Sequence, residues 1–325
     1  MLTTLKRYRH LAAAAPLMFA LVATASAQAP YPNRNITLVL PFAAGSGTDT
    51  TTRLIGKELG TALGVSMVIE NKAGANGSIA ASYVARSAPD GYTLFVTTNT
   101  THSANPYLLK NMTYDPIKDF TPIARTGDLP FMLVIHPDIP ANSVAELIAL
   151  AKKEPGKYSY ASGSSSAIVS GATFARLAGI DLLHVPYKSS PPALTDLIAG
   201  RVSMMFIDVP TGLPHVNAKA LKALAVTTRK PSALLPHLPT MDNTVKGFDI
   251  TSWQGYLGPA NMPKDMVVKL NAEIRKVIER PDIKNRLAER GMEAFSGTPE
   301  EFDAFLKEQL VLWDKLIADA GIEKQ

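Results

Sequence analysis

The chain alternates short apolar runs with longer amphipathic segments, which is the pattern of an α/β fold. In its first third, apolar runs at 36–40, 66–69 and 93–96 predict strands. Segment 50–63 and a segment that begins near Ile79 and ends before Pro89 carry apolar residues at helical spacing. The resulting β-α-β-α-β order requires a parallel sheet with right-handed crossovers.

A second run of the same kind follows. Apolar segments at 131–135, 157–161, 182–186, 202–207 and 223–227 predict strands, and helices are predicted at 144–151, at 168–177 and after Pro191. Ser143 and Glu146 have the spacing of a capping box. The Pro-rich, charged stretch 114–130 precedes this run and is assigned no element. A strand-like segment at 253–258 and helices at 263–280 and 299–317 end the chain, so we expect two lobes and a returning helical tail.

The N-terminus has the features of a signal peptide. Basic residues 6, 7 and 9 precede an apolar run at 11–24, and Ala25-Ser26-Ala27 is a small-residue cleavage site. The apolar run is short for a membrane span, and no later stretch is longer, so we predict an exported protein without stable membrane insertion. Removing residues 1–27 leaves 325 − 27 = 298 residues, enough for two domains, and lowers the formal net charge from +5 to +2 because three basic residues are lost. Nothing in this balance argues for nucleic acid.

Several classes of site are disfavoured by composition and motif. The chain has no cysteine, which excludes disulfides, thiolate metal sites and cysteine nucleophiles. Its histidines are scattered, no H-E-x-x-H or D-x-D-x-D-G pattern is present, and G-x-G-x-x-G is not completed because Thr50 follows Gly47 at that spacing. We therefore predict no metal ion and no cofactor.

A serine hydrolase is the enzyme alternative, because 162–166 is rich in serine. No G-x-S-x-G motif occurs. His184 lies inside an apolar strand and is interpreted as a structural histidine, whereas His102 lies in a post-strand loop without an evident acidic partner. Triads are recognised by geometry, so a serine-dependent esterase stays a distant alternative, and no catalytic residue is predicted.

The turn after the first strand is the first candidate binding element. Pro41 ends the apolar run, Gly45 and Gly47 follow, and Asp49 stands where a helix can start. Glycines at such a turn let backbone N–H groups point outward at the positive end of the helix dipole, which suits an anion. The alternative is an ordinary turn whose glycines relieve strain.

Small hydroxyl and glycine residues recur after other predicted strands. They occupy 43–48, 97–103, 162–166 and 188–190. In open α/β sheets such carboxyl-end loops face the ligand crevice. These loops offer hydroxyls, backbone N–H groups and one cation, Lys188, a chemistry that binds a small anion but does not readily break bonds. Ordinary turn composition is the alternative for each loop taken alone.

At this point the sequence resembles Bug-type, TctC-like extracytoplasmic solute receptors of tripartite tricarboxylate transporters. The resemblance covers essentially the whole chain after the leader. It rests on ordered matches in 31–49, where the family has the opening pattern P-F-x-x-G-G-x-x-D, and in 70–77, 88–94, 119–124, 184–188, 196–202, 224–227 and 253–256. Ser46 stands where the family has a second glycine.

The resemblance implies a periplasmic binding protein type II-like α/β fold, with two α/β domains, a cleft between them and crossover strands as the hinge. Domain 1 would comprise 28–126 plus 250–325, and domain 2 would comprise 127–249. Asp49 would orient the first helix and Asp208 would line the second-domain wall. With the loop pattern above, the predicted ligand-binding residues are Phe42, Ala43, Ala44, Gly45, Ser46, Thr48, Asp49, Asn99, Thr100, Ser162, Ser164, Ser165, Ser166, Lys188 and Asp208.

The function implied is that of a periplasmic, monomeric binding protein that captures a small organic carboxylate and delivers it to integral membrane transporter subunits. A binding protein that reports to a sensor kinase or chemoreceptor has the same cleft and a different partner, and it is the main alternative.

Overall fold

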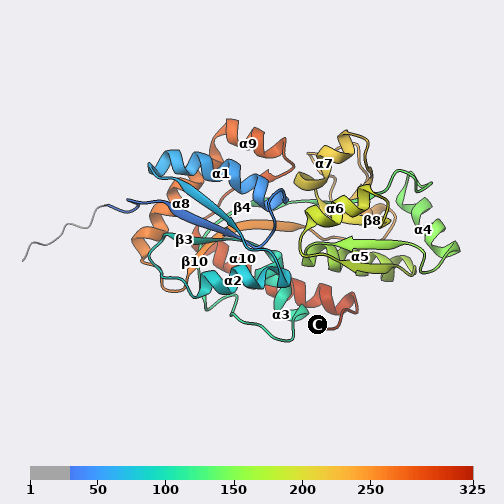
Figure 1. Ribbon diagram of the computed structural model, residues 1–325, viewed down its shortest axis with the longest axis horizontal. Helices are drawn as coiled ribbons and strands as arrows, with labels where there is room; N and C mark the ends of the chain where they lie inside the picture. The colour runs from blue at the N-terminus through green and yellow to red at the C-terminus, as the bar shows by residue number, and fades with distance from the viewer. Residues whose placement is uncertain (1–29, 325) are drawn as a thin grey trace, which may run out of the picture. The chain divides into compact units, whose positions relative to one another are not determined.

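The strands of residues 30–324, which the computed structural model describes, form two separate sheets (Figure 1). The six-stranded sheet has the order β11-β4-β10-β3-β1-β2 and contains β1 (Ile36–Leu40), β2 (Met67–Asn71), β3 (Thr93–Thr98), β4 (Phe120–Leu129), β10 (Ser252–Pro259) and β11 (Glu293–Ala294). The five-stranded sheet has the order β7-β6-β8-β5-β9 and contains β5 (Phe131–Ile135), β6 (Ser159–Ser162), β7 (Leu183–Pro186), β8 (Met204–Asp208) and β9 (Lys222–Val226). The predicted signal peptide lies outside the described residues.

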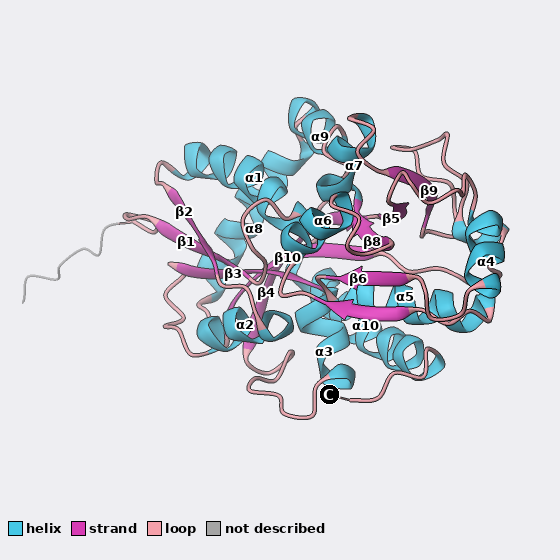
Figure 2. Cartoon of the chain, turned by 45° about the vertical axis from the view of Figure 1, so that its right-hand side comes forward, coloured by secondary structure: helices cyan, strands magenta, loops and turns pink. Residues whose placement is uncertain are grey.

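Helices accompany each sheet (Figure 2). Those that precede β4 or follow β10 are α1 (Gly47–Leu63), α2 (Ser78–Ala85), α3 (Asn105–Leu108), α8 (Lys264–Glu279), α9 (Pro281–Ala288) and α10 (Pro299–Asp319). Those between β5 and β9 are α4 (Val144–Lys153), α5 (Ser165–Ala178), α6 (Ser190–Ile198) and α7 (Val209–Asn217). Within residues 30–324, no helix combines the length and the apolar character that crossing a membrane requires.

The first β-α-β-α-β unit is confirmed as parallel. β1 lies between β2 and β3, with Leu38 opposite Ile69 on one side and opposite Leu94 on the other. In the second unit β6 pairs in parallel with β7 and β8, whereas β5 runs antiparallel to β8 and β9. Parallel strands aligned in this way bring their carboxyl ends, and the loops that follow them, to one edge of each sheet.

The stretch 114–130 was assigned no element from the sequence, and its residues 120–129 form the strand β4. It pairs along its length with the antiparallel strand β10, with two register shifts. Pro122, Gly127 and two charged residues obscured its apolar alternation. The charges are accommodated because Arg125 pairs with Asp128 and lies over the ring of Phe305.

The prediction of a polar loop at 97–103 was wrong. β3 continues to Thr98, and a π-helical turn, η2 (Thr100–Ala104), follows with all its residues buried. The hydroxyl of Thr97 bonds to that of Thr101 at 2.9 Å and to His102 Nδ1 at 2.6 Å. Thr97, Thr101 and His102 Nδ1 thus bond to one another inside the protein, whereas His102 Nε2 and the Ser103 hydroxyl are buried without a partner in residues 30–324. The polar composition of this segment reflects burial in an internal network rather than exposure to solvent.

Helix α10 contributes to both hydrophobic cores. Phe302 and Leu306 pack with the apolar residues of the six-stranded sheet, whereas Trp313 and Ile317 pack with those of the five-stranded sheet. Gln309, between the two pairs, accepts a hydrogen bond from the indole N–H of Trp313 and another from that of Trp253 on β10, each at 3.2 Å. The chain passes between the sheets at Pro130 and returns after β9. The division into domains at 126/127 and 249/250 stays a prediction.

Candidate functional site

A small cavity lies where loops of the two sheets meet. Its volume is about 20 Å³, which is room for about one water molecule. It is lined from the six-stranded side by Phe42, Ser46, Gly47, Thr48, Thr98, Thr100, Leu129 and Ser252, and from the five-stranded side by Phe131, Ser164, Ser190 and Asp208. Most of these residues lie at the carboxyl end of a strand or in the loop and first helical turn after it, as the carboxyl-end rule for α/β sheets predicts.

Four helices begin at the wall of this cavity. Ser46 caps α1 and Ser164 caps α5, each through its hydroxyl, and Asp208 caps α7 through its carboxylate. Ser190, in the wall, is the first residue of α6. The N-terminus of a helix carries a partial positive charge of about +0.5. Helices α6 and α7 contribute this charge but few N–H donors, because both have proline in the first turn and the N–H groups of Val209 and Thr211 are already bonded. No lysine or arginine is among the lining residues, so these helix ends and the hydroxyls supply the attraction for an anion.

The loop after β1 is held in place by Asp49. Its carboxylate accepts hydrogen bonds from Gly45 N, from Asn71 Nδ2 and from two nitrogens of Arg53, all at 3.0 Å. Burial alone raises the pKa of this carboxyl, but the hydrogen bonds from Arg53, Gly45 and Asn71 outweigh burial and leave the pKa below its ordinary value. Asp49 therefore orients the loop from behind and does not line the cavity.

Gly47 is the residue of this loop that sequence reasoning missed. A Cβ atom added to it would lie 2.8 Å from Asp208 Cγ and 3.2 Å from Pro210 Cβ. The first turn of α1 is thus in contact with the start of α7 on the other sheet. By contrast, Gly45 is a glycine because its φ is +83°, and a Cβ there would meet nothing within 4 Å. The Gly-Ser-Gly pattern was visible in the sequence, but the sequence did not show which of the two glycines faces the other sheet.

Asp208 is the one ionisable residue in the cavity wall, at 8% exposed. Its Oδ1 accepts hydrogen bonds from Thr211 N at 2.9 Å and from the Thr211 hydroxyl at 2.6 Å. Burial raises the pKa of this carboxyl, and the bonds from Thr211 offset that rise only in part. A negative group beside four positive helix ends is an unusual element of an anion site.

Direct hydrogen bonds cross between the two sides next to the cavity. Asn99 donates to the Ser166 hydroxyl at 2.7 Å and accepts from the Ser252 hydroxyl. Backbone N–H groups take part as well, because Ser165 N donates to Thr100 Oγ1 at 3.3 Å and Ala43 N donates to Ser189 Oγ at 3.1 Å. Several donors that the sequence assigned to a ligand are therefore used between the two sides in this arrangement.

The structure divides the predicted site residues into three groups. Those that line the cavity are Phe42, Ser46, Thr48, Thr100, Ser164 and Asp208. Those that join the two sides or their helices beside it are Ala43, Asn99, Ser165 and Ser166. Those that lie away from the wall are Ala44, Gly45, Asp49, Ser162 and Lys188, of which Ala44, Gly45 and Lys188 are exposed to solvent. Gly47, Thr98 and Ser190 lie in loops that were predicted to face the crevice but were not among the predicted site residues, and Leu129, Phe131 and Ser252 were not predicted.

Ser162 and His184 form a pair that bears on the esterase alternative. The Ser162 hydroxyl lies 2.7 Å from His184 Nε2, the spacing of a nucleophile and a base. Ser162 is only 1% exposed and does not line the cavity, and no carboxylate in residues 30–324 bonds to His184. Burial lowers the pKa of this histidine, whose ring stacks on Tyr160. The contact joins β6 to β7, the structural role that the sequence predicted for His184.

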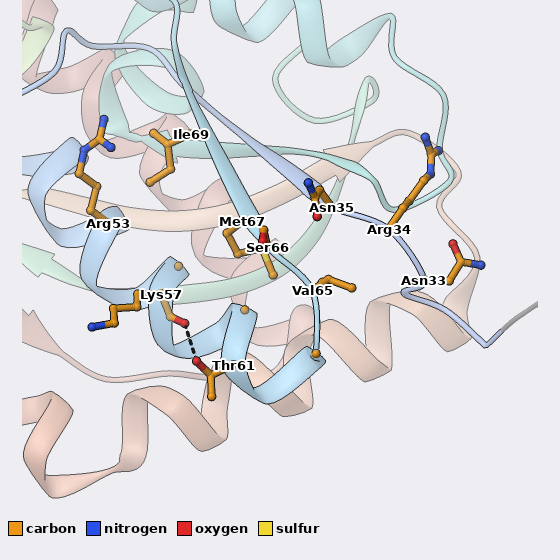
Figure 3. Close-up of a pocket in the computed structure, with 13 residues that line it drawn as sticks. Asn33, Arg34, Asn35, Arg53, Lys57, Thr61, Val65, Ser66, Met67 and Ile69 are labelled. Carbon is orange, nitrogen blue, oxygen red and sulfur yellow. Dashed lines mark hydrogen bonds between the residues drawn. The ribbon is translucent and has the colours of Figure 1, made fainter.

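A larger groove, of about 860 Å³, lies elsewhere, between α1 and the amino ends of β1 and β2 (Figure 3). Two of its basic side chains, Arg34 and Arg53, pair with Asp90 and Asp49, whereas Lys57 forms no ion pair within residues 30–324. Ligands of open α/β sheets bind at the carboxyl ends of strands, where the helix N-termini also lie. The small cavity is therefore the better candidate site.

The sequence matches the model of the tripartite tricarboxylate transporter family receptor over residues 51–322. The chain belongs to this receptor family. It is 34% identical over 290 residues to a UPF0065 protein encoded in the tcbD–tcbE intergenic region of Pseudomonas sp. strain P51, covering 88% of this chain and 86% of that one. It is 30% identical to Protein BugT of Bordetella pertussis, covering 89% of this chain and 90% of that one.

Solved structures of family relatives have the same fold. Rpa4515 of R. palustris with adipate superposes with a TM-score of 0.89 at 35% identity, covering 91% of this chain and 100% of that one. The periplasmic binding protein BugD superposes with a TM-score of 0.87 at 35% identity, again covering 91% of this chain and 100% of that one. MatC (Rpa3494) from Rhodopseudomonas palustris with bound malate superposes with a TM-score of 0.82 at 30% identity, covering 88% of this chain and 100% of that one. The predicted Bug-type family and the periplasmic binding protein fold are confirmed.

Proposed function

We propose that this family member is an exported receptor that binds a small organic carboxylate in the cavity between its two sheets. Four helix N-termini converge on a wall of hydroxyls without a lysine or arginine, and this is the observation that carries the proposal. Such a wall stabilises a carboxylate through N–H and O–H donors. The adipate and malate bound by two relatives belong to the same chemical class.

Binding requires the two sides to move. A cavity of about 20 Å³ has room for about one water molecule, and a dicarboxylate is several times larger than a water molecule. The ligand therefore enters when the direct bonds of Asn99 and Thr100 to the serines of α5 are released. It then replaces some of them with its own contacts to both sides. Because the ligand favours the form in which both sides reach it, affinity and closure are linked.

We assign the carboxylate to the first turns of α1 and α5. Ser46 and Thr48 face it from one side and Ser164 from the other. The receptor is then a periplasmic monomer, released from its signal peptide after Ala27, and its partners are the integral membrane subunits of a tripartite tricarboxylate-type transporter. It binds its ligand without transforming it.

The Thr48 hydroxyl allows a direct test. This side chain is 4% exposed and lines the cavity, and its hydroxyl bonds to no group in residues 30–324. The mature protein is first screened by thermal shift against organic acids, since a ligand that binds only the folded state raises the apparent stability. Thr48→Val then keeps the shape and removes the donor. A hydrogen bond to a charged group contributes about 1.5–3 kcal/mol, so calorimetric affinity should fall about 10-fold to 150-fold.

Thr61→Val is the matched control for this experiment. Thr61 lies in the last turn of the same helix, where its hydroxyl bonds to Lys57 O at 3.1 Å. This variant should bind like the parent. Equal affinities of all three proteins would remove α1 from the site, and a screen in which no organic acid stabilises the protein would refute carboxylate binding.

A further inference from the structure

The cavity wall contains one group that does not suit a simple anion site, the carboxylate of Asp208. It follows the fully buried apolar residues of β8, at the position where that strand ends and α7 begins. Its Oδ1 is saturated by Thr211, whereas Oδ2 has no hydrogen-bond partner in the described part of the chain. Since Asp208 lines the cavity, that oxygen is an acceptor available to a ligand.

The position of Asp208 relative to α1 fixes which part of a ligand it meets. A Cβ on Gly47 would lie 2.8 Å from Asp208 Cγ, so the carboxyl group already rests on the first turn of α1. A ligand carboxylate bound at Ser46–Thr48 uses that same turn. The two carboxylates are therefore neighbours, in a site whose wall offers no cationic side chain to separate them.

Two adjacent buried carboxylates repel each other unless a proton or a donor lies between them. The other carboxylate of this region, Asp49, is neutralised by Arg53 and lies behind the loop, so it supplies nothing to the pair. When Asp208 keeps its charge, the missing donor must come from the ligand. A hydroxyl or ammonium group on the carbon next to the ligand carboxylate reaches a neighbouring acceptor while the carboxylate itself stays on the helix turn.

We propose that Asp208 determines specificity by accepting a hydrogen bond from the ligand, so that the receptor prefers acids with an α-hydroxyl or α-amino group over the same acids without one. This inference rests on the proposed carboxylate site and narrows its ligand class. Asp208 then has two roles, because its carboxylate also caps α7.

The test uses pairs of acids that differ by one α-substituent: succinate with malate and with aspartate, glutarate with 2-hydroxyglutarate, and phenylacetate with mandelate. Calorimetric affinities are measured for the mature protein and for Asp208→Asn. Asparagine caps helices as well as aspartate does, so the start of α7 is preserved while the charge is lost. Asp115→Asn is the matched control, because Asp115 accepts two backbone N–H bonds in a turn and does not line the cavity.

In the parent protein the substituted acid of at least one pair should bind about tenfold more tightly, since a bond to a charged acceptor is stronger than one to a neutral acceptor. In Asp208→Asn this ratio should fall by about tenfold, with the plain acid gaining affinity, and in Asp115→Asn it should not change. A parent protein that prefers the plain acid in every pair overturns the inference without any variant. A ratio that Asp208→Asn leaves unaltered overturns it as well and reduces Asp208 to a helix cap. Both of these results leave carboxylate binding intact, whereas a panel in which no acid binds refutes the proposed function and this inference together.

Discussion

Gly47 is the position where the contact between the two sheets can be tested most simply. Alanine at residue 47 places a methyl group 2.8 Å from Asp208 Cγ, still closer to its Oδ1, and 3.2 Å from Pro210 Cβ. Carbon atoms pack best at about 3.5–4.0 Å, so the start of α7 must retreat from α1 by roughly 1 Å. The backbone of α1 does not need to change, because Gly47 is not among the residues with positive φ.

The expected loss follows from this overlap. Inserting a methylene-sized group into a well-packed contact costs about 1–3 kcal/mol, which corresponds to a ligand affinity about 5-fold to 150-fold lower if the ligand-bound form requires the same contact. The ligand-free protein relieves the overlap by letting the two sides separate. Replacing glycine in a helix gains about 0.5–1 kcal/mol, so the melting temperature without ligand should not fall.

The assay is calorimetric titration of Gly47→Ala with the best acid of the screen, together with thermal unfolding with and without that acid. Gly56→Ala is the control in the same helix, since its Cβ would meet the flexible Leu38 Cδ1 at 3.3 Å and Met67 Cβ at 3.5 Å, far from Asp208. Gly56→Ala should keep the parent affinity. If Gly47→Ala binds within twofold of the parent while remaining folded, the contact between α1 and α7 is not part of the ligand-bound form.

Two further predictions concern the pH dependence of stability. Burial lowers the pKa of His102 to about 3. Between pH 3 and the unfolded pKa of about 6.5, the unfolded chain therefore binds one more proton than the folded protein. The free energy of unfolding should fall toward low pH by up to about 1.4 kcal/mol per pH unit. Urea unfolding at pH 5, 6 and 7 should show a smaller slope for His102→Gln, and equal slopes would mean that the ring is hydrated. The lowered pKa of Asp49 stabilises the fold above its unfolded pKa of about 3.9, and this stabilisation is lost as pH falls through the folded pKa. Asp49→Asn should therefore destabilise the protein at pH 7 by about 1–3 kcal/mol and by much less near pH 2, and a loss that is the same at both pH values would contradict the assignment.

The sequence predicted most of the regular elements because their apolar spacing is plain. The strand at 36–40 and the helix at 263–280 are examples, and both are present within a residue of their predicted bounds. β4 escaped prediction because Gly127, with a φ of +146°, and the Arg125–Asp128 pair interrupt its alternation. Its place is set by β10, which lies far away in the sequence.

The candidate site was predictable in outline for a similar reason. Loops that follow strands gather at one edge of a sheet, which is why Ser46, Thr48 and Ser164 were found, whereas Asp208 was implied by the family resemblance. Local pattern could not tell which neighbour in a turn faces the other sheet. Gly47 faces the other sheet because it is the first residue of α1, whereas Gly45 lies in the turn before the helix. Lys188 is exposed to solvent although its neighbours Ser189 and Ser190 are buried.

Because α10 packs with both hydrophobic cores, the intrinsic tryptophan fluorescence of the protein should report on the contact between them. The chain has two tryptophans, one packed with each sheet, and their indole N–H groups share Gln309 Oε1. Indole emission responds to the polarity and hydrogen bonding around the ring. A rearrangement that pulls the two cores apart must therefore alter the surroundings of at least one of the rings. If the receptor opens and closes as proposed, its own fluorescence can follow the movement, without a dye and on the millisecond scale of a stopped-flow mixer.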